Sequence, residues 1–186
     1  MSNLILVAIV MVFTAVCAVL DWRTRIIPNW LTVPVFALGL LFHAIVGALS
    51  GPQFSFGGLA SGLQFSFLGF ATGFGLLLVL WLIGGGGGGD VKMMGALGAW
   101  LGSWHTIEAF LASAVATIFI GAVAVIGRAV FQSASTTGKS GRGSLMRRGK
   151  DDPKRIGRLM PYALPLAVGA WAVLVMAWIG GGLLPY

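Results

Sequence analysis

The sequence predicts an all-α polytopic membrane protein with six transmembrane helices and with its N-terminus and C-terminus outside. Of the 186 residues, 58% are hydrophobic and only 9% are charged. The mean hydropathy of +0.95 lies far above that of a soluble domain. Because one span takes roughly 20 apolar residues, the chain has room for about six spans and for little else. We therefore expect a single membrane-embedded domain over residues 1–186.

Six apolar runs are separated by polar or helix-breaking segments. The first run holds the single cysteine, Cys17, and lacks the basic start and small-residue cleavage site of a signal peptide, so we interpret it as a retained span. The fourth run is short for a bilayer, which predicts a helix that is tilted, partly inserted or continuous with residues past 104. The runs cover residues 3–20, 30–49, 58–83, 93–104, 106–127 and 160–183.

Small residues recur along the third run every three or four positions. This spacing lets a neighbouring helix approach closely, so it predicts tight packing and says nothing about chemistry. The residues are Gly58, Gly62, Ser66, Gly69 and Gly73.

The basic residues set the predicted topology. Lysine and arginine concentrate in cytoplasmic connections, and the six-span assignment places all twelve of them on one side of the membrane. Omitting the fourth span would put Lys92 and the basic stretch at about 128–159 on opposite faces. That stretch is rich in Ser, Gly, Lys and Arg, so we expect a flexible cytoplasmic loop. No aromatic residues interleave with its charges, so the expected partner is the lipid bilayer and not nucleic acid.

Two of the five acidic residues are candidates for chemistry. Asp21 ends the first predicted span and Asp90 opens the fourth, so the predicted topology puts both carboxyl groups at the same depth on the cytoplasmic side. Two neighbouring carboxyl groups share a proton, one acting as base and the other as acid, and can activate a water against an amide without a metal. Pairing of each aspartate with a nearby Lys or Arg at a helix end is an equally good explanation.

Six consecutive glycines, residues 84–89, precede Asp90. Glycine is costly inside a helix, but a flexible glycine segment can offer its backbone N–H and C=O groups to an extended peptide and lets that peptide approach closely. Irregular backbone is tolerated at membrane depth where it lines a polar cavity. A plain flexible connection is the alternative, and it would not need to end on an aspartate.

Three stretches of the sequence match the pattern of a known family. They are LDWRTRIIPNWLT at 20–32, GGGGDVKMMGALG at 86–98 and MPYALPLAVGA at 160–170. In this order and spacing they resemble the type IV prepilin peptidases, the Gly-x-Gly-Asp aspartic proteases of bacterial membranes. The resemblance implies a multi-pass enzyme of the bacterial inner membrane that needs no cofactor. It would cleave the basic leader from prepilins at the cytoplasmic face and leave their hydrophobic helix in the bilayer.

The resemblance also assigns roles to residues. Asp21 and Asp90 would be the catalytic pair, with Gly87 and Gly89 as the glycines of the motif. Lys92 would lie beside the pair, where its charge could favour the singly ionised state or hold the loop. Four more residues would shape the site where the second and last spans begin, since proline is tolerated in a first helical turn: Pro28, Asn29, Pro161 and Pro165.

Larger members of the family carry an amino-terminal cytoplasmic region with paired cysteines, which is linked to methylation of the new N-terminus. Here the chain begins with a span and has one cysteine, so it resembles the short peptidases of the Flp/Tad pilus branch, and methyltransferase activity is not expected. His43 and His105 have no second ligand at suitable spacing, so no metal site is expected.

Two rival functions are compatible with the same residues. A presenilin-like or signal-peptide peptidase would share the Gly-x-Gly-Asp chemistry, but the element around Asp21 matches the prepilin pattern. A small proton- or ion-coupled transporter could use the same two aspartates, and broken glycine-rich helices would fit it as well.

Overall fold

The computed structural model describes residues 2–24, 26–84, 87–135 and 163–180. These residues form helices and short connections, with no strand among them. Four helices are long and apolar enough to cross a membrane, which confirms the all-α, multi-pass part of the prediction. The helices are α1 (Ser2–Thr24), α2 (Asn29–Ala48), α3 (Phe56–Leu82), α4 (Gly88–Ser135) and α5 (Ala163–Gly180).

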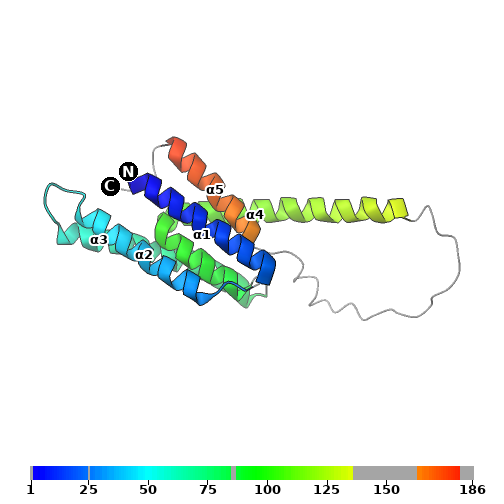
Figure 1. Ribbon diagram of the computed structural model, residues 1–186, viewed down its shortest axis with the longest axis horizontal. Coiled ribbons are helices and arrows are strands. Elements are labelled where there is room, and N and C mark those ends of the chain that lie inside the picture. Colours follow the sequence, from blue (N-terminus) through cyan, green and yellow to red (C-terminus); the bar gives the residue numbers. More distant parts are fainter. Residues whose placement is uncertain (1, 25, 85–86, 136–162, 181–186) are drawn as a thin grey trace.

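The helices lie side by side in one bundle and alternate in direction along the chain (Figure 1). As a result, α1 and α3 end where α2, α4 and α5 begin. We call this end of the bundle the site end. Two hydrogen bonds join its parts directly, one between α1 and α5 and one between α2 and α4.

The long helix α4 is broken at Gly102. This glycine has φ 72° and ψ 175°, a conformation that residues with a Cβ rarely adopt, and an added Cβ would collide with the ring of Phe65. The first arm, residues 88–101, turns back there, and the second arm, residues 103–135, extends beyond the rest of the bundle (Figure 1).

The break agrees closely with the gap between the fourth and fifth apolar runs. At about 1.5 Å per residue the first arm is roughly 21 Å long, shorter than the ~30 Å core of a bilayer. The second arm continues to Ser135, past the end of the fifth run at 127, so helix also covers the start of the stretch expected to be a basic loop. The remainder of that stretch lies outside the described residues.

The end of the first arm leaves carbonyl groups in buried surroundings. In lipid an unpaired carbonyl costs several kcal/mol, and buried polar side chains from three helices meet these carbonyls. A carbonyl oxygen only accepts, so the His43 nitrogen that contacts one of them carries the proton. The three pairs are Ser66 Oγ to Ala99 O at 2.6 Å, His43 Nε2 to Trp100 O at 3.0 Å and Thr106 Oγ1 to Gly102 O at 2.5 Å.

The first arm of α4 packs against α3 through glycines. A Cβ on Gly69 would collide with the carbonyl oxygen of Gly98, and a Cβ on Gly73 would collide with that of Met94. This contact between α3 and α4 is the most extensive in the bundle. The small-residue spacing in the sequence therefore marked a true helix interface, as expected for close backbone approach.

Candidate active site

Asp90 lies in the first turn of α4 and is 8% exposed. Its Oδ2 accepts a hydrogen bond from the backbone N–H of Gly87 at 3.2 Å, while the carbonyl of Gly87 accepts from the N–H of Asp90 at 3.1 Å. In this arrangement the third residue of a helix reaches back to cap its start. A negative charge is also favoured there by the helix dipole.

Asp21 lies in the last turn of α1 and is half-buried. Its Oδ2 accepts a hydrogen bond from the backbone N–H of Ala163 at 3.3 Å. Ala163 is the first residue of α5, and an N–H at that position has no partner within its own helix. Each aspartate is therefore held by one backbone N–H at a helix start, Asp90 by that of α4 and Asp21 by that of α5.

The structure brings the two predicted carboxylates together. They come from the first and fourth helices, lie at the same end of the bundle, and are close enough for their charges to interact unfavourably. Among the described residues, neither forms an ion pair with a lysine or arginine; the ion pair found there joins His105 and Glu108. The described part of the chain thus gives no support to helix-end charge pairing as the explanation for the aspartates.

The two motif glycines allow close approach at different places. A Cβ on Gly87 would lie 2.9 Å from Asp90 Oδ2, so this glycine makes room for the carboxylate. A Cβ on Gly89 would lie 3.4 Å from Ile27, which is buried in the connection between α1 and α2. Residues 85–86 of the glycine run lie outside the described residues.

The remaining predicted site residues that the structure describes lie at the starts of α2, α4 and α5. Lys92 is exposed, and its Nζ donates to Asn29 Oδ1 at 2.8 Å, which joins the start of α4 to the start of α2. Pro28 is the N-terminal cap of α2, so Pro28 and Asn29 begin the second helix as predicted. Pro165 is buried in the first turn of α5, and Pro161 lies outside the described residues.

The two histidines lie away from the carboxylates. His43 is fully buried in α2, where it meets the end of the first arm of α4. His105 Nδ1 lies 2.9 Å from Glu108 Oε2 on the second arm. Across the described ranges, no group of three His, Cys, Asp or Glu side chains is placed to hold a metal ion.

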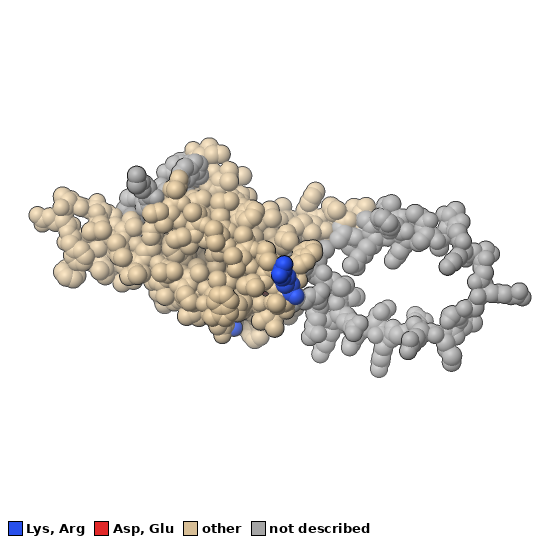
Figure 2. Space-filling view, in the orientation of Figure 1, with Lys and Arg blue, Asp and Glu red and all other residues tan. Residues whose placement is uncertain are grey.

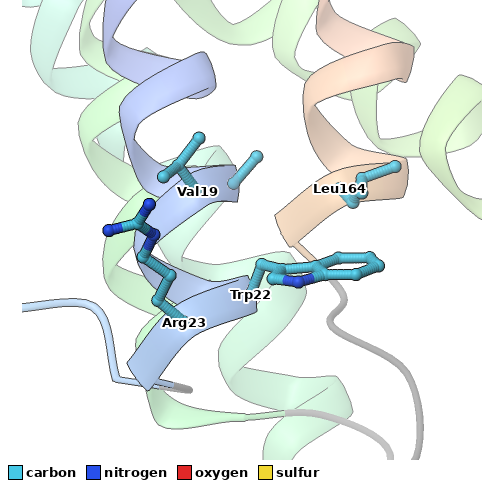
Figure 3. Close-up of a pocket in the computed structure, with 5 residues that line it drawn as sticks. Val19, Trp22, Arg23 and Leu164 are labelled. Atoms are coloured by element: carbon cyan, nitrogen blue, oxygen red, sulfur yellow. The ribbon is translucent and has the colours of Figure 1, made fainter.

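A hollow of about 260 Å³ opens between the end of α1 and the start of α5 (Figure 3). Figure 3 shows Trp22 reaching from the end of α1 toward α5, below Leu164, whereas Arg23 points to the other side of α1. The only sequence signal for this hollow was that two of its residues directly follow Asp21. Its lining residues are Ala18, Val19, Trp22, Arg23 and Leu164.

A second hollow, of about 330 Å³, lies between α1 and α2 toward the middle of α1. All of its lining residues are apolar, and no titratable side chain contributes to it. They are Ala8, Ile9, Val12, Phe13, Val16, Leu31 and Val35.

The fold and the site define a multi-pass helical membrane protein with an acid pair at one end of its bundle. The model of the type IV leader peptidase family matches residues 8–122. This match covers more than half of the chain and includes both aspartates, so the chain belongs to the type IV leader peptidase family.

One curated relative is the prepilin leader peptidase/N-methyltransferase of Escherichia coli (strain K12). It is 33% identical over 106 residues, which cover 53% of this chain and 41% of that protein. The chain therefore aligns with less than half the length of this relative. No solved structure matches.

Proposed function

We propose that the chain is an aspartic endopeptidase that removes the leader peptide of type IV prepilins, with Asp21 and Asp90 as the catalytic pair. The observation that carries this proposal is the position of the two carboxylates. They lie at the same end of the bundle, each is held by a backbone N–H, and neither pairs with a lysine or arginine among the described residues. Membership of the leader peptidase family and the name of the Escherichia coli relative support the reaction and the substrate.

The carboxylate geometry suits general acid–base chemistry. The backbone hydrogen bonds engage Oδ2 of each aspartate, which leaves the two Oδ1 atoms for a water and for the scissile amide. The ionised carboxylate takes a proton from the water as it attacks the carbonyl carbon. The protonated carboxylate donates to the substrate, and the two exchange roles as the intermediate breaks down. Backbone N–H groups orient the carboxylates without neutralising them.

We further propose six membrane spans, with both termini outside and the site end at the cytoplasmic face of a bacterial inner membrane. If the two arms of α4 are counted separately, the described helices form six segments that alternate in direction. Arg23 and Lys92 both lie at the site end, and on the face seen in Figure 2 the visible blue surface lies only there. This placement agrees with the concentration of basic residues on the cytoplasmic side.

Cysteine labelling tests this topology. In a Cys17→Ala background, Ser50→Cys and Ser140→Cys should react with an impermeant thiol reagent from opposite sides of the membrane. Ser50 is exposed in the connection between α2 and α3, and Ser140 lies outside the described residues. Labelling of both from one side would exclude six spans.

We propose that the substrates are prepilins of the Flp/Tad type and that the chain does not methylate its products. The sequence holds one cysteine, which is buried in α1, and therefore no cysteine pair of the kind associated with methylation. Mass spectrometry of the cleaved pilin, with a methyl donor present, should show a free N-terminal amine. A methylated product would contradict this part of the proposal.

The decisive experiment measures cleavage and ion flux with the same purified protein. In detergent, wild type should shorten a prepilin by its leader, and sequencing of the new N-terminus should give a single cut site. The transporter alternative is favoured by the broken helix α4, because discontinuous helices form many ion sites. Flux through proteoliposomes without any cleavage would favour the transporter.

A further inference from the structure

We propose that Trp171 is a positioning residue for prepilin cleavage. Its indole Nε1 donates a hydrogen bond to Thr14 Oγ1 at 2.8 Å, which joins the middle of α5 to α1. This bond sets how α5 lies along α1, and therefore where the start of α5 holds the carboxylate of Asp21. The inference rests on the proposed peptidase function. Neither Trp171 nor Thr14 belongs to a motif identified in the sequence.

Thr14 is a polar contact on an otherwise apolar helix face. Its hydroxyl donates to the carbonyl oxygen of Val10 in its own helix at 2.7 Å, so a lone pair of the same oxygen is left to accept from Trp171. An indole N–H can only donate, and a threonine oxygen can donate and accept at once. The pair therefore has one defined geometry. Thr14 is fully buried, and the other buried residues of α1 are Leu6, Val10, Phe13 and Cys17.

The hydrogen bond of Trp171 has the same helix register as the one at the site. Asp21 and Thr14 are seven residues apart on α1, whereas their partners Ala163 and Trp171 are eight residues apart on α5. Both separations are about two helical turns, roughly 11 Å and 12 Å, along helices that run in opposite directions. One alignment of α5 on α1 therefore satisfies both bonds, and a shift that breaks one also disturbs the other.

The position of α1 in the bundle depends on α5. The main contact of α1 with the rest of the bundle is with α5. In turn, α5 packs tightly on the second arm of α4, because an added Cβ on Gly169 would collide with the backbone of Ser113 and Ala109. Between membrane helices, apolar packing alone permits sliding, and a buried hydrogen bond fixes the register. Loss of the bond should therefore let Asp21 move relative to Asp90.

Prepilin cleavage by purified variants tests this role. Trp171→Phe keeps an aromatic ring but removes the N–H, and Thr14→Val keeps the side-chain shape but removes the oxygen. Each should lower kcat by about 5-fold to 50-fold with KM changed less than about twofold, because a small displacement of a catalytic group costs rate more than binding. The double variant should be no worse than the single ones, because all three lack the same bond.

Three further variants serve as controls. Thr14→Ser keeps the hydroxyl and should retain kcat within about twofold of wild type. Thr117→Val removes a hydroxyl that donates within its own helix, to Ser113 O at 2.7 Å. Trp104→Phe replaces a tryptophan that is 70% exposed near the break in α4. The last two variants should also cleave at close to the wild-type rate, because they leave the contact between α1 and α5 intact.

Thermal unfolding, measured in parallel, separates positioning from folding. Wild-type kcat in both Trp171→Phe and Thr14→Val would overturn the inference, and so would additive losses that follow stability. If Trp171→Phe folds poorly, the comparison of Thr14→Val with Thr14→Ser carries the test, and equal kcat in these two would overturn it. A wild type that does not cleave prepilin would refute the proposed function itself.

Discussion

The two carboxylates sit in contrasting parts of the bundle. Asp90 begins a helix arm in which residues 93–101 are all buried and which meets α3 backbone to backbone through glycines. Asp21 ends a helix that contacts α4 only sparsely and is bordered by hollows toward α2 and α5. The difference teaches that one carboxylate lies at the start of the most extensively packed helix arm, whereas the other lies at the end of a helix flanked by open hollows. Substitutions in the two regions should therefore affect different properties, stability in the packed region and catalysis near the carboxylates.

The largest effect is expected from the carboxylates themselves. Asp21→Asn and Asp90→Asn keep the side-chain shape but remove one member of an acid–base pair, so each should lower prepilin cleavage by at least about 10³-fold. The double variant should be hardly worse, because residues that act as one unit are strongly non-additive. Cleavage rates and thermal unfolding of all four proteins check this. Modest, additive losses that track stability would instead indicate structural charges.

The next effect should appear in stability rather than in catalysis. Gly69→Ala puts a Cβ into the carbonyl of Gly98, so it should lower the free energy of unfolding by about 1–3 kcal/mol. Gly75→Ala is the matched control, because nothing lies within 4 Å of its added Cβ and alanine favours helix by up to about 1 kcal/mol. Thermal unfolding should separate the two in opposite directions. A Gly69→Ala protein as stable as wild type would show that the α3–α4 contact is not rigid.

A smaller effect, on catalysis, is expected at the start of α4. The Cβ in Gly87→Ala would lie 2.9 Å from Asp90 Oδ2 and should displace the carboxylate, at a cost of about 10-fold to 100-fold in kcat. In Gly88→Ala the nearest atom, Trp81 Nε1, is 3.9 Å away, so activity should stay close to wild type. Prepilin cleavage by the two variants, with thermal unfolding in parallel, measures this difference. Equal activity would mean that Asp90 does not need its present position.

The smallest effect is expected at Lys92, an exposed residue near the start of α4. Lys92→Met removes the hydrogen bond to Asn29, and exposed interactions of this kind contribute less than about 1 kcal/mol. Cleavage should change by less than about fivefold, and Asn29→Ala should show the same change. A loss comparable to that of the aspartate variants would mean that the Lys92 charge acts on the carboxylates.

Hydropathy and residue spacing predicted most of the helices, because membrane-spanning helices are long, apolar segments that stand out in the sequence. The apolar runs located the helices, the small-residue pattern located the α3 interface, and Asp21 and Asp90 were identified as the pair that could meet. The gap between the fourth and fifth apolar runs predicted an interruption near residue 105. It occurs at Gly102 instead, because the positive φ and the Phe65 ring admit only glycine there.

Other features could not be predicted because they leave no mark in the sequence. The groups that hold Asp21 and Asp90 are backbone N–H groups of Ala163 and Gly87, which nearly every residue type could supply. The hollow between α1 and α5 is formed by residues that are far apart along the chain. Lys92 and Asn29 were both predicted to shape the site, but their hydrogen bond to one another becomes visible only once α2 and α4 lie together.

The two hydrogen bonds to the carboxylates have an electrical consequence. The start of a helix carries a partial charge of roughly half a proton, and two such starts, those of α4 and α5, face the pair. Unlike a lysine, this positive charge cannot be lost by deprotonation, acetylated or removed by a side-chain substitution. The field across the two acids is therefore a permanent property of the folded backbone. Among the described residues no lysine or arginine forms an ion pair with either acid, so any pH dependence of the proposed chemical step is expected to report the aspartates and the substrate.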